Sequence, residues 1–188
     1  MLILLNGPPR SGKDTAGQWL SKWLGLPLVK LTAPLDRAIA AFFQISPQRW
    51  AYLREEGKDQ PAPELFGYTP RQVLISLGEH WAKPLLGQDV FGQLAPKYGI
   101  ITDVGFRPEA EALVQPDHTF LVRIHRPGCT FANDSRNYID LSDLNVPTYD
   151  LNNSSTLEAY QQAVYNLSTQ LLHHLAPTSA PYRRSHIT

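Results

Sequence analysis

Short runs of apolar residues alternate along the chain with segments in which apolar residues recur every three or four positions. The short runs are typical of buried strands, and the spaced segments are typical of helices with one buried face. Strands that alternate with helices form a parallel sheet covered on both faces, so the pattern predicts an α/β fold. We expect about five strands, at 2–5, 28–31, 100–104, 119–124 and 148–151.

The helical segments have recognisable ends. The first, over 13–24, stops before Gly25, a residue that often ends helices. The last begins with Ser-Thr-Leu-Glu at 155–158, which has the form of a capping box, and keeps its apolar spacing to residue 175. Two further helices are expected, at 33–43 and 109–113.

The pattern breaks between residues 44 and 70, where prolines and charged side chains gather. We expect this segment to be irregular. Such an insertion is either a lid or binding element or a solvated surface excursion, and both interpretations stay open. Thr69 and Pro70 then suit the N-cap and the first position of a new helix. We expect a single domain over 1–176, with a helical insertion at about 44–97 that forms a lid, followed by a flexible tail over 177–188.

Composition excludes several classes of protein. The 188 residues carry 17 Lys and Arg against 17 Asp and Glu, so the net charge gives no long-range attraction to nucleic acid or an anionic membrane. The single cysteine, Cys129, excludes an internal disulfide. No apolar run approaches the roughly 20 residues of a membrane span. We therefore expect a cytoplasmic protein that does not bind a membrane.

The first strand leads directly into the loop 7–13, Gly-Pro-Pro-Arg-Ser-Gly-Lys, which has the G-x-x-x-x-G-K pattern of phosphate-binding loops. Backbone N–H groups of such a loop, and the helix that follows it, bind the phosphates of a nucleotide. Lys13 is expected at the β- and γ-phosphates. The loop therefore predicts ATP and Mg²⁺ as ligands. Asp14 stands where Ser or Thr is usual, and we expect Asp14 or Thr15 beside the ion. The loop residues expected at the nucleotide are Gly7, Ser11, Gly12, Lys13, Asp14 and Thr15.

Further charged residues follow the other strands, at the edge where ligands of parallel sheets bind. Asp103 ends the third strand and is expected either to contact the metal or the phosphate acceptor, or to cap a helix. Transfer of a phosphoryl group requires positive charge around its oxygens. Arg10 inside the loop and Arg126 on a turn after the fourth strand are candidates for that role, and Arg107 also follows a strand.

The sequence resembles the phage deoxynucleoside monophosphate kinases in four segments, which occur in the same order as in that family. The segments are 10–15, 69–79, 103–111 with 123–128, and 149–158. The resemblance implies a P-loop NTPase fold of the nucleoside-monophosphate-kinase type, in which ATP donates its γ-phosphate to a deoxynucleoside monophosphate. It implies that the insertion lies on the acceptor side. It further implies acceptor contacts from Arg71, Asp103, Arg107 and Glu109, an ATP-phosphate contact from Arg126, and a place beside adenine for Asn153.

Two positions depart from the family's pattern. Gly105 stands where an arginine is often found, and Lys83 stands where an arginine is common. Arg and Lys are not equivalent at a phosphate site, so both departures affect the acceptor side. They favour a second hypothesis, a related phage kinase that phosphorylates 5-hydroxymethyluracil within DNA. A third hypothesis is a nucleotide-binding module without catalysis. Whether the protein forms a homodimer stays open. If a phage encodes it, we expect it to act in the cytoplasm of the host cell.

Overall fold

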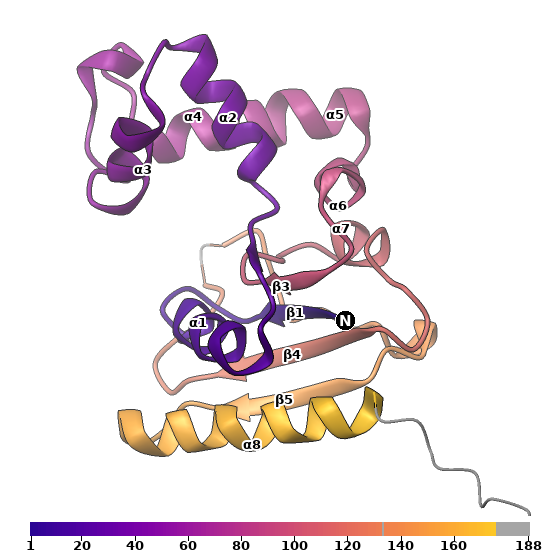
Figure 1. Ribbon diagram of the computed structural model, residues 1–188. Helices are drawn as coiled ribbons and strands as arrows, with labels where there is room; N and C mark the ends of the chain where they lie inside the picture. The colour runs from indigo at the N-terminus through magenta and orange to yellow at the C-terminus, as the bar shows by residue number, and fades with distance from the viewer. Residues whose placement is uncertain (133, 176–188) are drawn as a thin grey trace, which may run out of the picture.

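The computed structural model describes residues 1–132 and 134–175, so the predicted tail over 177–188 lies outside the described residues. At its centre lies a parallel sheet with the strand order β2-β3-β1-β4-β5 (Figure 1). Within the described residues, no helix is long and apolar enough to cross a membrane. The strands confirm those predicted from sequence: β1 (Leu2–Asn6), β2 (Leu28–Val29), β3 (Gly99–Ile101), β4 (Thr119–His125) and β5 (Thr148–Asn152).

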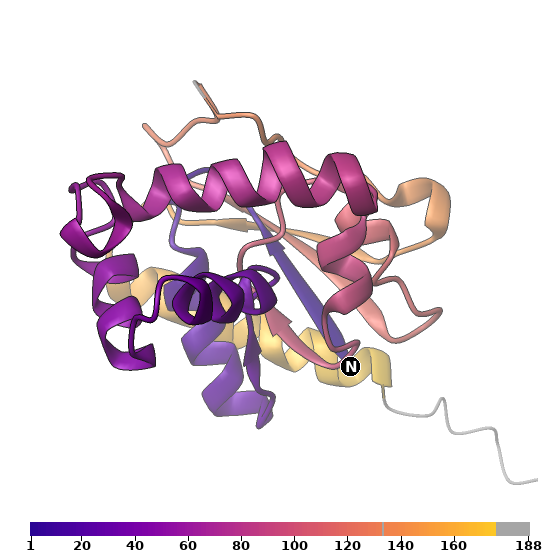
Figure 2. The same ribbon diagram turned by 90° about the horizontal axis from the view of Figure 1, so that it is seen from above.

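Helices cover both faces of the sheet, which confirms the predicted α/β architecture (Figures 1 and 2). Helices α1 and α8 pack on one face, and α2 to α5 form a helical layer beyond the other. With a glycine-rich loop between β1 and α1, this topology is the α/β P-loop NTPase fold of nucleoside-monophosphate-kinase-like proteins. The helices are α1 (Lys13–Leu24), α2 (Ala33–Phe42), α3 (Pro47–Glu55), η1 (Pro63–Leu65), α4 (Pro70–Leu77), η2 (Gly78–Ala82), α5 (Lys83–Leu86), α6 (Val90–Leu94), α7 (Arg107–Glu111), η3 (Ser142–Leu144) and α8 (Leu157–Leu175).

The central strand β1 shows how the sequence produces these layers. All its residues are buried, and successive side chains of a strand point to opposite faces. Ile3 and Leu5 pack in the core formed with α1 and α8, whereas Leu2 and Leu4 pack in the core formed with the helical layer. One continuous apolar run therefore serves both cores.

The segment 44–70 is more regular than its sequence suggests. It contains α3, which begins where the Ser46 hydroxyl accepts a hydrogen bond from the Arg49 N–H at 3.2 Å. Pro47 occupies the first helical position, where a missing N–H costs nothing, so this proline starts a helix instead of breaking one. The expectation of an irregular segment was wrong here. The last helix is also capped one residue later than expected, by Thr156.

Helix α4 begins at a capping box formed by Thr69 and Gln72. It continues through the π-helical turn η2 into α5, and this brings the Lys83 side chain into the interior with 2% of it exposed. The Lys83 ammonium lies 3.0 Å from Glu109 and 2.9 Å from Glu79, and it stands over the ring of Phe106. Burial raises the pKa of Glu109, and the charge of Lys83 opposes that rise. Lys83 and Glu109, both expected at an acceptor site, are therefore paired in the interior between α5 and α7.

Lys83→Met is expected to lower the free energy of unfolding by about 3–5 kcal/mol, because it leaves the Glu109 carboxylate buried without its closest cation. The double variant Lys83→Met/Glu109→Gln should be more stable than Lys83→Met alone. Urea unfolding followed by circular dichroism measures both. The matched control is Arg49→Ala, which removes an exposed ion pair with Glu64 and should leave the midpoint nearly unchanged. Equal losses in Lys83→Met and Arg49→Ala would contradict the buried-pair interpretation.

Candidate active site

The candidate site is built where the central strands end. Asn6, the last residue of β1, is buried and donates from Nδ2 to the carbonyls of Val104 and Asn137, at 3.2 and 3.3 Å. Its Oδ1 accepts from the Ile139 N–H at 3.0 Å. One side-chain amide thus joins the connections that follow β1, β3 and β4. These connections carry most of the charged residues that the sequence places at a phosphate site.

The loop between β1 and α1 depends on two of its glycines. A Cβ on Gly7 would lie 2.7 Å from the carbonyl oxygen of Ile124, so no side chain fits there. Gly12 has a φ of 103°, in the left-handed region that favours glycine. Asn153 Nδ2 donates to the Ser11 carbonyl at 2.9 Å, and the Tyr160 hydroxyl donates to the Gly12 carbonyl at 3.1 Å. The end of the loop is therefore fastened to β5 and α8, and Asn153 contacts the loop itself.

Lys13 lies inside this loop, where Nζ donates to the carbonyls of Gly7 and Pro8, both at 2.7 Å. Burial, together with the nearby Arg136 guanidinium, lowers the pKa of Lys13 from 10.5 to about 8. The buried hydroxyl of Ser11 finds no hydrogen-bond partner among the described residues. A largely buried ammonium and an orphaned hydroxyl in one loop are donors that a phosphate group would satisfy.

Asp14 faces the end of β3. Its Oδ1 accepts from the Lys30 ammonium at 2.6 Å and from the Thr102 hydroxyl at 2.9 Å, and 72% of its side chain is exposed. Among the described residues, no group of three or more His, Cys, Asp or Glu side chains is placed to hold a metal. Mg²⁺ usually takes one or two carboxylates beside phosphate oxygens and water, so an exposed Asp14 next to the loop fits this ion. Thr15 is half-buried in the first turn of α1.

Asp103 fixes the connection between β2 and α2. Its Oδ1 accepts from the Leu31 N–H at 2.9 Å, and its Oδ2 accepts from the N–H and the hydroxyl of Thr32, each at 3.3 Å. These contacts fall on the two residues before α2, whose N-cap is Thr32, so Asp103 braces the segment that leads into α2 and is not itself the N-cap of a helix. The same residue also lines the cleft of the site.

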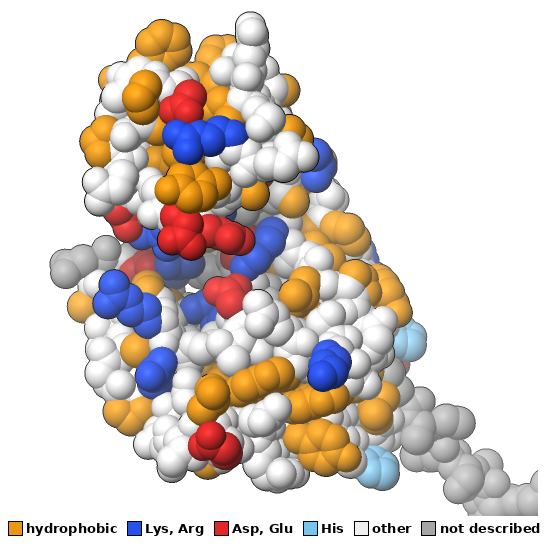
Figure 3. Space-filling view, turned by 60° about the vertical axis from the view of Figure 1, so that its left-hand side comes forward, with side chains coloured by type: hydrophobic (Ala, Val, Ile, Leu, Met, Phe, Trp, Pro, Cys, Tyr) orange, Lys and Arg blue, Asp and Glu red, His pale blue; other side chains and the backbone are white. Residues whose placement is uncertain are grey.

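A cleft of about 920 Å³ opens beside Asp14 and Asp103, between the sheet and the helical layer, and charged side chains gather in this hollow (Figure 3). Among the described residues, the lining has four basic and four acidic side chains together with an apolar stretch, mainly from α2 and α3. The basic residues are Lys30, Arg37, Arg54 and Lys58; the acidic residues are Asp14, Asp36, Glu55 and Asp103; the apolar residues are Leu28, Ala40, Ala41, Ile45, Pro47, Trp50 and Ala51.

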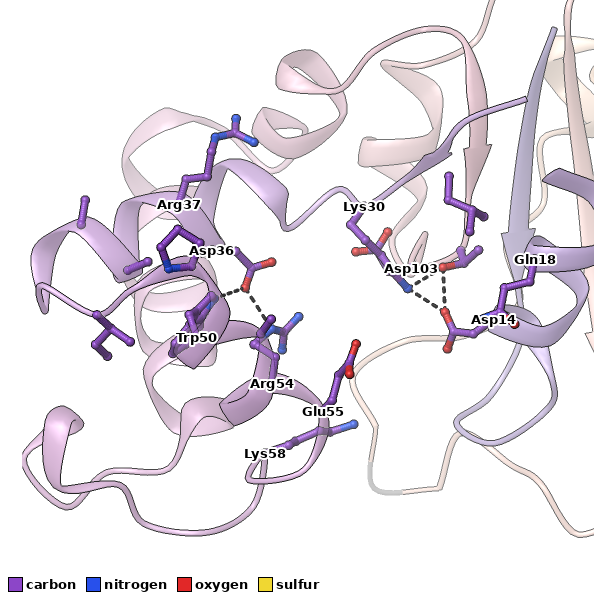
Figure 4. Close-up of a pocket in the computed structure, with 17 residues that line it drawn as sticks. Asp14, Gln18, Lys30, Asp36, Arg37, Trp50, Arg54, Glu55, Lys58 and Asp103 are labelled. Atoms are coloured by element: carbon purple, nitrogen blue, oxygen red, sulfur yellow. Dashed lines mark hydrogen bonds and ion pairs between the residues drawn. The ribbon is translucent and has the colours of Figure 1, made fainter. Parts of the chain in front are cut away.

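Arg54 is held firmly in the wall of this cleft. Its Nε lies 2.9 Å from Asp36 Oδ1, which also accepts from the indole N–H of Trp50 at 2.9 Å. Its Nη2 donates to the Thr32 hydroxyl at 3.5 Å, so the guanidinium is fixed beside the start of α2. Lys58 projects toward the cleft from the segment after α3, Arg54 lies beside Asp36, and Arg37 points away (Figure 4). The wall formed by α2 and α3 thus presents two cations beside an apolar surface.

The structure brings some of the sequence-predicted arginines to the loop and not others. Arg126 Nη1 donates to the carbonyl of Arg10 at 3.1 Å, so both residues belong to the phosphate loop region. Arg71 pairs with Asp59 at 2.5 Å, and Arg107 pairs with acidic side chains of α7 and η3. None of Arg71, Arg107 and Glu109 lines the cleft itself. The backbone N–H of Arg71 donates to the carbonyl of Lys58, a lining residue, at 3.1 Å.

Sequence reasoning missed four cations of the site: Lys30, Arg54, Lys58 and Arg136. Arg54 follows Trp50 by four positions, one turn of a helix, but the segment was interpreted as irregular. Lys30 directly follows β2 in the structure, but the sequence pattern places it inside the expected strand over 28–31, so its place at the ligand-binding edge was not recognised. Arg136 lies in the connection between β4 and β5, which has no periodic pattern, and no local signal singles it out.

Neither a protein-family model nor a curated protein sequence matches this chain. Similar solved structures include a shikimate kinase from Aquifex aeolicus, with 15% sequence identity and a TM-score of 0.42 over 93% of this chain and 98% of that one. A gluconokinase from Sinorhizobium meliloti has 14% identity and a TM-score of 0.43 over 95% and 97% of the two chains. The fold assignment itself follows from the strand order and the loop described above.

The place of Asp14 predicts a role in metal-dependent nucleotide binding. Asp14→Asn should raise the Mg²⁺ concentration needed for half-maximal ATP binding by about 10-fold, because the anionic oxygen facing the ion is lost. Asp14→Ser, which restores the commoner hydroxyl, should need a lower Mg²⁺ concentration for half-maximal ATP binding than Asp14→Ala. Calorimetric titrations with ATP at graded Mg²⁺ concentrations measure this. If none of the three variants changes the dependence, Asp14 acts only as a first-turn helix charge.

Proposed function

We propose that the protein is an ATP-dependent phosphotransferase that moves the γ-phosphate of ATP to a deoxynucleoside monophosphate. The observation that carries the proposal is the juxtaposition of a phosphate-binding loop containing Lys13 with a cleft of about 920 Å³ at the ligand-binding edge of the sheet. The cleft volume lies within the range of small-molecule sites. Transfer between two nucleotides requires a donor loop next to an acceptor cleft. In this protein the two meet at Asp14.

On the donor side, the loop from Gly7 to Lys13 binds the ATP phosphates with backbone N–H groups and the Lys13 ammonium. Arg126 and Arg10 add positive charge next to the loop, and Asn153 borders the adenine. Asp14, with Thr15 beside it, holds Mg²⁺ directly or through water. When bound, the ion neutralises charge on the phosphate oxygens.

On the acceptor side, the wall formed by α2 and α3 receives the monophosphate. The apolar residues of this wall contact the base, and Arg54 with Lys58 binds the phosphate. Arg54 takes the role that the sequence assigns to Arg71, because it lines the cleft and its Nε is fixed there by Asp36. Asp103 holds the start of α2, and hence the wall, at its distance from the loop.

The second candidate is phosphorylation of 5-hydroxymethyluracil within DNA. The charge of the cleft favours the free nucleotide, because its described lining has equal numbers of basic and acidic side chains. A polymer that contacts several phosphates is held mainly by an excess of Lys and Arg.

The deciding experiment offers radiolabelled ATP with two acceptors in parallel: a panel of free deoxynucleoside monophosphates, and DNA that contains 5-hydroxymethyluracil. We expect label in a deoxynucleoside diphosphate. Label in the DNA alone would replace the first function with the second. Tight ATP binding without transfer to either acceptor would identify a nucleotide-binding module without catalysis.

Lys13→Ala should abolish transfer and leave the protein folded. The ammonium at the phosphates is a charge-assisted contact to the reacting group, and its loss should lower the rate by about 100-fold or more. The initial rate of the transfer assay and a thermal melt of the same preparation measure the two parts. Wild-type turnover in a folded Lys13→Ala variant would contradict the assignment of the loop.

Arg54→Ala should lower kcat/KM for the acceptor by roughly 10- to 100-fold, the effect of losing a hydrogen bond to a charged group. The KM for ATP should change far less. Arg71→Ala is the direct comparison, because its guanidinium is paired with Asp59, and its loss should be several times smaller. Steady-state kinetics with each substrate varied separates the two. A larger loss in Arg71→Ala than in Arg54→Ala would reinstate the sequence-based assignment.

A further inference from the structure

Arg136 reaches the site from a part of the chain without regular secondary structure. It lies between β4 and β5, and its side chain crosses directly over the backbone of Gly105, which follows β3. A Cβ built on Gly105 would overlap Cγ and Cδ of Arg136. The absence of a side chain at position 105 is therefore what admits the arginine.

The guanidinium of Arg136 is held in one orientation. Asp134 Oδ1 accepts from Arg136 Nε at 2.8 Å and from its backbone N–H at 3.0 Å, and Asp134 Oδ2 accepts from Nη2 at 2.5 Å. Only 30% of the Arg136 side chain is exposed. In the described part of the chain these bonds use one edge of the guanidinium, so the Nη1 edge keeps its donors for a ligand.

The charges around Arg136 indicate what kind of ligand this is. The hydrogen-bonded Asp134, and further away the carboxylates of Asp103 and Glu109, raise the pKa of Arg136. After burial itself, Arg136 is the strongest influence that lowers the pKa of Lys13. The two cations repel each other, so an anion that binds between them is stabilised by both. The neighbouring residue Asn137 accepts at 3.3 Å from Asn6, which directly precedes the phosphate loop, so the backbone that carries Arg136 lies beside the start of that loop.

We infer that Arg136 is a catalytic residue that contacts the phosphoryl group during its transfer, and that Gly105 is the position that admits it. The inference rests on the proposed function. In the step, the bond from the γ-phosphorus to the β–γ bridging oxygen breaks, and its electron pair leaves with ADP. A bond forms from the same phosphorus to an oxygen of the acceptor phosphate. Arg136 stays protonated throughout and donates to the oxygens on which negative charge is shared.

The test is a double-variant cycle on Gly105 and Arg136. Arg136→Ala should lower kcat by about 100- to 1000-fold with little change in the KM for ATP, the effect of losing one donor to a reacting centre. Arg136→Lys should recover only part of the rate, because an ammonium cannot reproduce the planar donor edge. Gly105→Ala keeps the charge but displaces the side chain, and should also lower kcat. The Gly105→Ala/Arg136→Ala variant should be no slower than Arg136→Ala alone.

Arg49→Ala is the matched control, because it removes an exposed arginine of α3 paired with Glu64, and it should keep the wild-type kcat. Thermal melts of all variants show whether the fold is retained. Independent effects of Gly105→Ala and Arg136→Ala, which multiply in the double variant, would overturn the link between the two positions. A wild-type kcat in folded Arg136→Ala would overturn the catalytic role.

A binding measurement keeps this inference separate from the proposed function. Calorimetry compares ADP with Mg²⁺ against ADP with Mg²⁺ and aluminium fluoride, which mimics the phosphoryl group in transfer. Arg136→Ala should weaken binding of the fluoride complex by 10-fold or more and leave binding of ADP unchanged. This result would support the inference even if the wild-type protein transferred phosphate to no acceptor, an outcome that would refute the proposed function alone. Equal weakening of both complexes would assign Arg136 to ADP binding and overturn the inference.

Discussion

The side-chain amide of Asn6 is the interaction on which the geometry of the site depends. It is buried at the end of the central strand and uses both its donor and its acceptor on the backbones that follow β3 and β4. A satisfied polar group in the interior permits few alternative arrangements, because any shift would leave it unpaired. Three connections are therefore held together, and with them the phosphate loop, Asp103 with Gly105, and Arg136.

A second set of polar contacts holds the helical layer over the sheet. Asp103 binds the backbone at the start of α2, and Asp36, one turn into that helix, fixes Trp50 and Arg54 of α3. The wall of the cleft is thus fastened to the end of β3 through a short series of hydrogen bonds. Hydrogen bonds between paired charges direct Arg54, while the apolar side chains beside it give the wall its shape. The site combines oriented cations with a surface on which a planar ring can pack.

Local patterns predicted the fold well where the pattern had one interpretation. The apolar runs gave five strands in the right places, and the spacing over 13–24 gave α1 with its bounds. The pattern misled at Pro47, because a proline at the first position of a helix looks the same in sequence as a proline that interrupts one. Because α3 was not predicted, the place of Arg54 in the wall of the cleft was not predicted either. The site was therefore less predictable than the fold.

The sequence by itself determined the α/β architecture and the phosphate loop, since apolar periodicity and the positions of Gly7, Gly12 and Lys13 are local features of the chain. Only the tertiary structure decided which cations lie near that loop. Arg71 and Arg136 carry the same charge, yet one pairs with Asp59 and the other pairs with Asp134 and crosses the backbone of Gly105. The reason is physical: a long charged side chain is placed by the backbone and the carboxylates that pack around it, and those come from distant parts of the chain.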